Sequence, residues 1–154
     1  MTRVGNSWSE HGSDFASTVG TGGVVGTKFV MPTSDPKFKP VVLTTDKEEH
    51  WKKWIGIYNG KMLSKGTFRN LYVYGYDVPE GYAIEKDTKM YYAFFSDSSK
   101  PWKGKVELRG LTAGRYHVLD YADGKDLGMV QAGDQKAPEL ATEFKGHLLL
   151  EVGK

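Results

Sequence analysis

The sequence has 154 residues, 39% of them hydrophobic and 26% charged, a composition typical of one folded domain of ordinary size. Its 21 basic and 19 acidic residues are interspersed and give a net charge of +2, which argues against the clustered basic surface of a nucleic-acid-binding protein. There is no cysteine, so disulfides and thiolate metal sites are excluded, and the absence of an 18-residue apolar run predicts no membrane-spanning helix.

The first 23 residues are polar, small and rich in glycine. The segment that follows, Gly22–Val30 (GGVVGTKFV), is a short β-branched run between glycine and proline, and this pattern predicts a buried strand. Prolines 32, 36 and 40 then predict an irregular loop.

An amphipathic helix is predicted from about Asp46 to Leu63. Its start, Thr45-Asp46-Lys47-Glu48, matches a capping box, in which the threonine hydroxyl serves a first-turn amide and the glutamate reaches back. The inner face is built by residues at the spacing i, i+3, i+4 and i+7, namely Trp51, Trp54, Ile55 and Tyr58. A helix with two tryptophans on its inner face is expected to pack against an extensive apolar surface.

Residues 66–154 contain eight short β-prone runs, separated by turn signals every eight to twelve residues. The runs are TFRNLYVYG, GYAIEK, MYYAFFS, KVELRGL, RYHVLDYA, LGMVQA, ATEFK and HLLLEV. They predict an antiparallel β-sandwich without helices. The run MYYAFF is continuous rather than alternating, which indicates a central strand buried on both faces. The predicted fold is therefore mainly β, with a strand–helix unit in residues 1–64 and the sandwich in residues 65–154.

Three segments together resemble the C-terminal part of the α-galactosidases of glycoside hydrolase family 36 and its relatives in clan D. They are DFASTVGTGGVVGTKF, HWKKWIGIYNGKMLSKGTFRNLYVYGYDVPEGYAIEK and the later YYAFF, WKGKVELRGL and YHVLDYADGKDLG runs. The resemblance implies a (β/α)8 catalytic barrel followed by an antiparallel β-domain. A barrel needs about 250 residues, so residues 1–64 look like a remnant of its end: the eighth strand at about 22–30 and the last helix at about 46–63.

The family's retaining mechanism uses two carboxylates, a nucleophile and an acid/base. The resemblance places the nucleophile on a central strand in a Lys-x-Asp context, and no such strand is present here. The acid/base is an Asp shortly after an Arg, and Arg3 and Asn6 stand in that relation. An amide cannot cycle a proton, so no catalytic residue is predicted, with Asn6 an acid/base-like position only. The alternative is that Asn6 fixes a turn.

Further substrate-binding candidates lie in the same glycine-rich segment. At a barrel mouth Trp8 can stack on a sugar ring, while Glu10, Asp14 and Arg3 can hold hydroxyls. The alternative for Asp14 is the N-cap of a short helix, FASTVG. Gly22 and Gly23 either let a ligand approach the backbone or let the chain turn. Glu10, His11 and Asp14 are a weak metal-ligand pattern, and neither a metal nor a cofactor is predicted.

The sequence thus indicates a C-terminal fragment of an α-galactosidase-like glycoside hydrolase, inactive alone, so whether the chain is itself an enzyme stays open. Its expected partners are an α-galactoside-type carbohydrate and either the missing barrel or a second copy, with no nucleic acid or membrane. The alternative is a free-standing carbohydrate-binding sandwich, in which Trp51 and Trp54 would be buried against the chain's own sheet. The absence of cysteine and of a visible signal peptide favours a cytoplasmic location.

Overall fold

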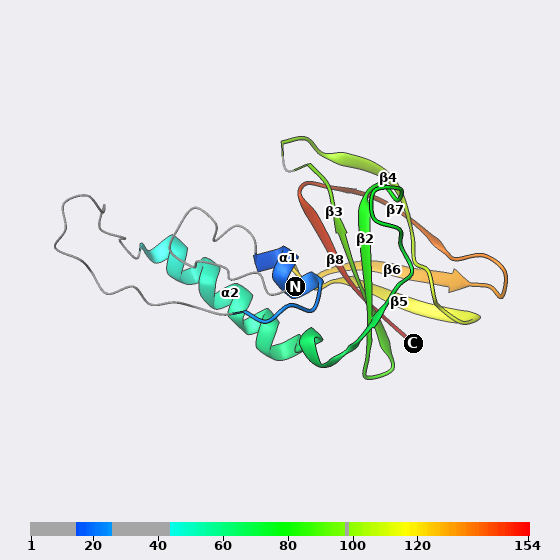
Figure 1. The fold of residues 1–154 in the computed structure, drawn as a ribbon, viewed down its shortest axis with the longest axis horizontal. Helices are drawn as coiled ribbons and strands as arrows, with labels where there is room; N and C mark the ends of the chain where they lie inside the picture. Colours follow the sequence, from blue (N-terminus) through cyan, green and yellow to red (C-terminus); the bar gives the residue numbers. More distant parts are fainter. Residues whose placement is uncertain (1–14, 26–43, 98) are drawn as a thin grey trace.

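The computed structural model describes residues 15–25, 44–97 and 99–154, and this part of the chain is mainly β (Figure 1). Two helices, α1 (Phe15–Gly20) and α2 (Thr45–Lys61), and a 3₁₀ turn, η2 (Leu63–Lys65), precede the strands. The strands are β1 (Thr67–Arg69), β2 (Glu80–Lys86), β3 (Lys89–Phe95), β4 (Trp102–Glu107), β5 (Gly114–Asp120), β6 (Lys125–Ala132), β7 (Glu139–Phe144) and β8 (His147–Gly153). Each of the eight predicted β-runs overlaps one of these strands.

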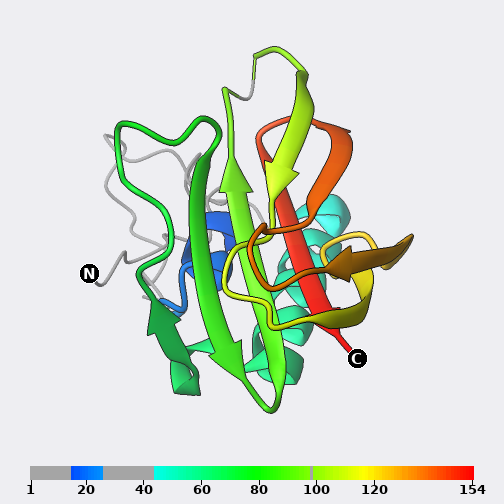
Figure 2. The same ribbon diagram turned by 90° about the vertical axis from the view of Figure 1, so that its right-hand side faces the viewer.

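All strand pairs are antiparallel and form two sheets. The larger sheet has the order β1-β2-β3-β8-β5-β6, and β4 pairs with β7 in a separate two-stranded sheet. Figure 2 shows β4 and β7 in front of the larger sheet, while α2 lies behind it. The antiparallel sandwich expected from the sequence is therefore present, with a helical layer covering the outer face of its larger sheet.

Strand β3 lies at the centre of this arrangement, and its alternating side chains enter two different cores. Tyr92 and Phe94 point into a cluster that includes Val106 of β4 and Phe144 of β7. Tyr91 and Ala93 point the other way, into a cluster with Phe15 of α1, Trp54 of α2 and Leu149 of β8. The continuous aromatic run MYYAFF is thus buried on both faces, as predicted, because helices cover one face and the small sheet covers the other.

Helix α2 begins at Thr45, one residue before its predicted start, and ends at Lys61, before the predicted end at Leu63. Thr44 is the N-cap, and its hydroxyl accepts a hydrogen bond from the amide of Lys47 at 3.4 Å. Glu48 instead forms an ion pair with Lys52 one turn along the helix, at 2.6 Å. At the other end Met62 takes a left-handed conformation (φ 45°), which ends the helix before Leu63 and starts η2.

The strand predicted over Gly22–Val30 is wrong for its first residues, because Gly22–Val25 form no strand. The physical reason is that Gly22 and Gly23 end helix α1. The amide of Gly22 donates to the Val19 carbonyl at 3.1 Å and that of Gly23 to the Thr18 carbonyl at 2.8 Å. With Gly22 at φ +72°, this is the Schellman arrangement of a helix C-terminus. Residues 26–30 lie outside the described part of the chain.

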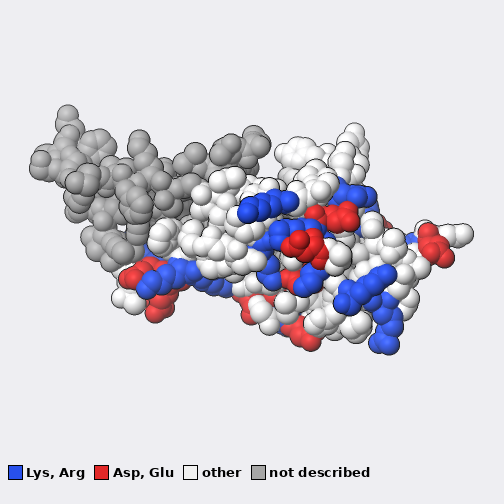
Figure 3. Space-filling view, turned by 90° about the horizontal axis from the view of Figure 1, so that it is seen from below, with Lys and Arg blue, Asp and Glu red and all other residues white. Residues whose placement is uncertain are grey.

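Basic and acidic side chains lie next to one another on the face of the molecule shown in Figure 3, rather than in separate fields of one sign. Among the described residues, neither helix is long and apolar enough to cross a membrane.

Candidate functional site

The end of helix α1 rests directly on the larger sheet, and small residues allow this approach. A Cβ atom on Gly20 would lie 2.7 Å from the Ala93 Cβ and 2.8 Å from the Leu149 Cδ2. A Cβ on Gly22 would lie 2.8 Å from the Ile84 Cδ1. Side chains at Gly20 and Gly22 would therefore force the α1 end away from β2, β3 and β8. The close approach of α1 to the sheet, which these two glycines allow, therefore shapes the cavity beside the helix end.

A cavity of about 370 Å³ opens at this helix end. Its described lining combines hydroxyl groups, two glycines and two aromatic rings: Ser17, Thr18, Thr21, Gly22, Gly23, Phe68 and Tyr82. The volume falls in the lower range of small-molecule sites. Hydroxyls that can exchange hydrogen bonds, next to aromatic carbon, are the groups that a sugar ring requires.

The aromatic wall of this cavity is fixed by packing and hydrogen bonding. Phe68 of β1 is 54% exposed, and its ring centroid lies 6.4 Å from that of Tyr82 on β2. The Tyr82 ring also packs edge-on against Phe95 of β3 at 5.9 Å, and its hydroxyl donates to the Glu80 carboxylate. Pre-organised rings contribute to binding at low entropic cost. Phe68 is the ring best exposed for stacking.

The polar wall comes from helix α1 and the residue after it. Thr18 is buried, while the Thr21 hydroxyl donates to the Ser17 carbonyl at 2.8 Å and keeps its lone pairs as acceptors. None of the seven described lining residues carries a carboxylate, an imidazole or an ammonium group. The described cavity can therefore bind a ligand but offers no side chain for general acid–base catalysis.

Only two of the predicted site residues lie in the described part of the chain, and both line the cavity: Gly22 and Gly23. The other candidates lie outside the described residues: Arg3, Asn6, Trp8, Glu10 and Asp14. The structure places a short helix, α1, over the FASTVG segment, which was the alternative considered for the residues after Asp14.

Sequence reasoning missed both walls of the cavity. The hydroxyl wall has a signal, because residues 17, 18 and 21 have the i, i+1, i+4 spacing of one helix face. Nothing in the sequence brings Phe68 and Tyr82 to this helix, since their position depends on the pairing of β1 with β2 and on the packing of α1 over the sheet.

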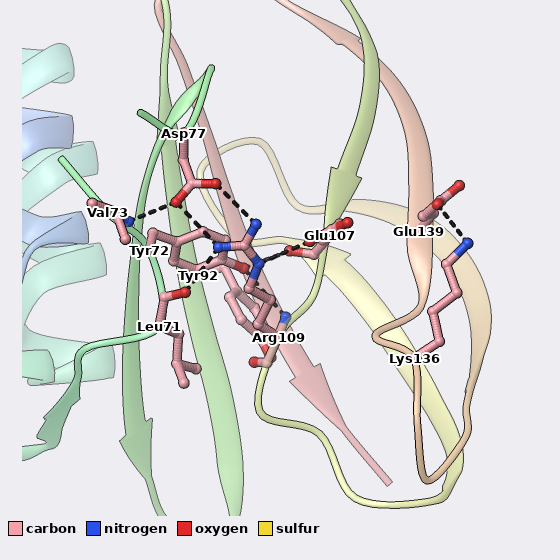
Figure 4. A network of polar contacts seen from close by, with 9 residues as sticks. All are labelled: Leu71, Tyr72, Val73, Asp77, Tyr92, Glu107, Arg109, Lys136 and Glu139. Atoms are coloured by element: carbon pink, nitrogen blue, oxygen red, sulfur yellow. Dashed lines mark hydrogen bonds and ion pairs between the residues drawn. The ribbon is translucent and has the colours of Figure 1, made fainter. Parts of the chain in front are cut away.

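A second polar cluster surrounds Arg109, on the side of the larger sheet that faces β4 and β7 (Figure 4). Two guanidinium nitrogens of Arg109 contact the two carboxylate oxygens of Asp77, at 2.9 and 3.1 Å. A third nitrogen donates to Glu107 at 2.8 Å, and the Leu71 carbonyl accepts at 3.0 Å. The guanidinium carbon lies 4.9 Å from the centre of the Tyr72 ring.

This cluster is explained by the fold. Asp77 also accepts from the Val73 amide at 2.6 Å, so the Arg109–Asp77 pair fastens the 71–79 loop to the strand layer. The hydrogen bonds from Arg109, and then that from Val73, hold the pKa of Asp77 below its ordinary value. Burial raises the pKa of Tyr92, whose hydroxyl donates to the Arg109 carbonyl at 2.7 Å. All of these contacts are internal to the chain, so the cluster has a structural role.

Several glycosidases of known structure are similar in arrangement to this chain. An α-amylase from Geobacillus thermoleovorans, solved with acarbose, matches 92% of this chain and 33% of its own at 12% identity and a TM-score of 0.59. An Anoxybacillus α-amylase matches 94% of this chain and 33% of its own at 9% identity and a TM-score of 0.58. α-Galactosidase I from Mortierella vinacea matches 96% of this chain and 36% of its own at 12% identity and a TM-score of 0.57.

These matches extend over nearly the whole chain and therefore beyond the strands into the helical segment. In each of these three enzymes about a third of the chain shares the fold described here, and at 9–12% identity the likeness is one of fold.

A sequence relative gives a narrower comparison. The chain is 36% identical over 110 residues to a Flavonifractor plautii protein named A type blood α-D-galactosamine galactosaminidase. The match covers 68% of this chain but only 10% of that protein, so the chain spans about a tenth of its relative's length. No protein-family model matches the sequence.

Proposed function

We propose that this chain is the C-terminal part of a glycoside hydrolase that acts on terminal α-galactosides or α-galactosaminides, of the family 36 type, and that it is inactive alone. The similarity to the galactosaminidase over 110 residues carries this proposal, because 36% identity on that length far exceeds what a shared β-sandwich alone requires. The likeness to glycosidases of known structure supports it at the level of the fold.

In this proposal the chain forms one wall of the site that binds the sugar. The cavity at Gly22 and Gly23 supports this role, since it presents hydroxyls and an exposed phenylalanine but no acid or base. In this proposal the catalytic carboxylates belong to a barrel that the chain completes. Asn6 remains an acid/base-like position that cannot itself transfer the proton. The proposed partners are the α-galactoside and that barrel, or a second copy of the chain.

One observation favours the alternative, a free-standing carbohydrate-binding module. Trp54 is only 4% exposed and lies among residues of α1 and of the chain's own sheet. The helical segment therefore finds its apolar partner within this chain. The same packing is compatible with the enzyme part, because the glycosidase matches also include this segment.

Two measurements on the purified chain test the proposal. The first is hydrolysis of 4-nitrophenyl α-D-galactopyranoside and of the matching α-galactosaminide, for which no turnover is expected. The second is a ¹H–¹⁵N NMR titration with methyl α-D-galactopyranoside, in which we expect shifts at the Gly22 and Gly23 amides. Thr21→Val should weaken these shifts by removing a lining hydroxyl, whereas Thr112→Val, which lies away from the cavity, should not.

Turnover by the chain alone would overturn the proposed inactivity. If the chemical shifts of Gly22 and Gly23 did not change on titration, the cavity would not be the sugar site. Tight binding of a galactose-containing polysaccharide, with no turnover, would favour the free-standing module.

A further inference from the structure

A second cleft, of about 350 Å³, lies between helix α2 and the ends of β5–β8. It shares no lining residue with the cavity at Gly22 and Gly23. The first half of α2 lines it, together with the β5–β6 turn, the β7–β8 turn and the strand residues next to these turns. Its size lies within the range of small-molecule sites.

The inner wall of the cleft consists of two packed rings. The imidazole of His147 meets the edge of the Trp54 ring, with centroids 5.6 Å apart and planes at 69°. Burial lowers the pKa of His147 and so favours the uncharged imidazole, which has one donor and one acceptor nitrogen. The side chain is thus held in place and can exchange hydrogen bonds with a hydroxyl group, both giving and receiving.

Carboxylates from the end of β5 and from the β5–β6 turn also line the cleft. Asp120 is half-buried, and its Oδ1 accepts a hydrogen bond from the Ala122 amide at 3.0 Å, which fixes its orientation. Asp123 accepts from the Lys53 ammonium at 3.0 Å, and this ion pair links α2 to the β5–β6 turn. Fixed carboxylate oxygens are the usual acceptors for the paired hydroxyls of a sugar.

The charges around the cleft cancel. It is lined by three lysines and three carboxylates, Lys53, Lys125, Lys145, Asp120, Asp123 and Glu143, besides the imidazoles of His50 and His147. A lining of this kind favours neither an anion nor a cation over a neutral ligand. No group of three acidic or histidine side chains suited to a metal occurs in the described part of the chain.

From this geometry we infer that the cleft binds a neutral, hydroxyl-rich ligand, a single sugar residue, at a site separate from the Gly22–Gly23 cavity. Asp120 and Asp123 accept from its hydroxyls, His147 both donates and accepts, and the lysines donate. The inference does not depend on the proposed activity. A carbohydrate chain held here would tether the protein to its substrate without taking part in bond cleavage.

The test is an NMR titration of the full chain with methyl α-D-galactopyranoside and methyl α-D-glucopyranoside, which follows the amides of residues 120–125 and 143–148 and the Trp54 indole. Saturable shifts in this set are expected for a neutral glycoside. Asp120→Asn should weaken this binding by about tenfold, because it replaces a charged acceptor. Asp134→Asn, an exposed aspartate that does not line the cleft, should leave it unchanged.

D-Galactosamine and D-galacturonate serve as charged counterparts of the neutral probes. Tighter binding of either would overturn the inference of a neutral ligand. Shifts limited to Gly22 and Gly23 would overturn the second site while leaving the proposed function intact. The absence of shifts in the cleft with every probe would overturn the site, as would equal losses in Asp120→Asn and Asp134→Asn.

Discussion

Gly22 ties the end of helix α1 to the cavity beside it. Its φ of +72° is costly for any residue with a Cβ, and that Cβ would lie 2.8 Å from the buried Ile84. We therefore expect Gly22→Ala to lower the free energy of unfolding by about 1–3 kcal/mol. Urea denaturation followed by circular dichroism measures this loss.

Gly56 in helix α2 is the matched control, since the Cβ it would carry meets no atom within 4 Å beyond its chain neighbours and the nearby backbone of its own helix. Gly56→Ala should stabilise the protein by about 1 kcal/mol, because alanine has the higher helix propensity. If both substitutions changed stability in the same direction, the conformational role of Gly22 would be wrong.

Glu151 of β8 is a buried carboxylate between two lysines. Lys61 at the end of α2 and Lys89 of β3 both donate to it, so it joins the helical layer to the sheet. Burial alone would raise the pKa of Glu151, but the hydrogen bonds from the two lysines outweigh burial and lower it. Glu151→Gln should cost about 2–3 kcal/mol of unfolding free energy at pH 7.

The loss of unfolding free energy in Glu151→Gln should depend on pH, and it should be smaller in acid. Because the folded pKa lies below the unfolded value of about 4.3, the contribution of Glu151 is complete above that pH and disappears as the pH falls through the folded pKa. The difference in unfolding free energy between the wild type and Glu151→Gln should therefore become smaller below about pH 4. Glu143→Gln breaks an exposed ion pair with Lys103 at 3.7 Å, and its unfolding free energy should differ much less from that of the wild type at every pH.

At the scale of elements, the 71–79 loop depends on Arg109. The guanidinium holds Asp77 with two nitrogens and the Leu71 carbonyl in addition, a geometry that lysine cannot reproduce. Arg109→Lys should speed hydrogen exchange at the Val73 and Asp77 amides and cost about 1–3 kcal/mol.

Arg69→Lys is the comparison, because the Arg69 side chain makes an exposed hydrogen bond to Glu85, at 2.7 Å, and none to the loop. It should leave exchange in the loop unchanged. Equal exchange rates in the two variants would show that the loop is held by its own turn and not by Arg109.

At the scale of the whole molecule, helices and sheet share one core. Trp54 packs with Phe15 of α1 and with Tyr91 and Leu149 of the sheet. The helical layer should therefore unfold together with the strands, in a single transition seen equally by helical circular dichroism and by aromatic signals. Trp54→Ala should destabilise this unit by about 3–5 kcal/mol. Two separate transitions in the wild type would contradict a shared core.

Local chemistry was enough to predict most elements of this fold. Turn residues separate the eight β-runs, and the spacing of the inner face of α2 is right for three of its four predicted residues, Trp51, Trp54 and Tyr58. Ile57 packs into the core in place of the predicted Ile55. These features depend on neighbours in the chain, so the sequence alone determined them. The boundaries of α2 shifted because Thr44 and Met62, at its two ends, adopt conformations that propensity does not specify.

The candidate site was decided by tertiary structure. The sequence singled out Gly22 and Gly23 but predicted a strand there, whereas the packing of α1 on β3 and β8 makes them a helix end. Phe68 reaches the same cavity through the pairing of β1 with β2, and Trp54 meets His147 only because α2 covers β8. The sequence thus determined which segments are helix or strand, since backbone preference and hydrophobic period are local. Only tertiary structure decided which side chains share a cavity, because such contacts join residues far apart in the chain.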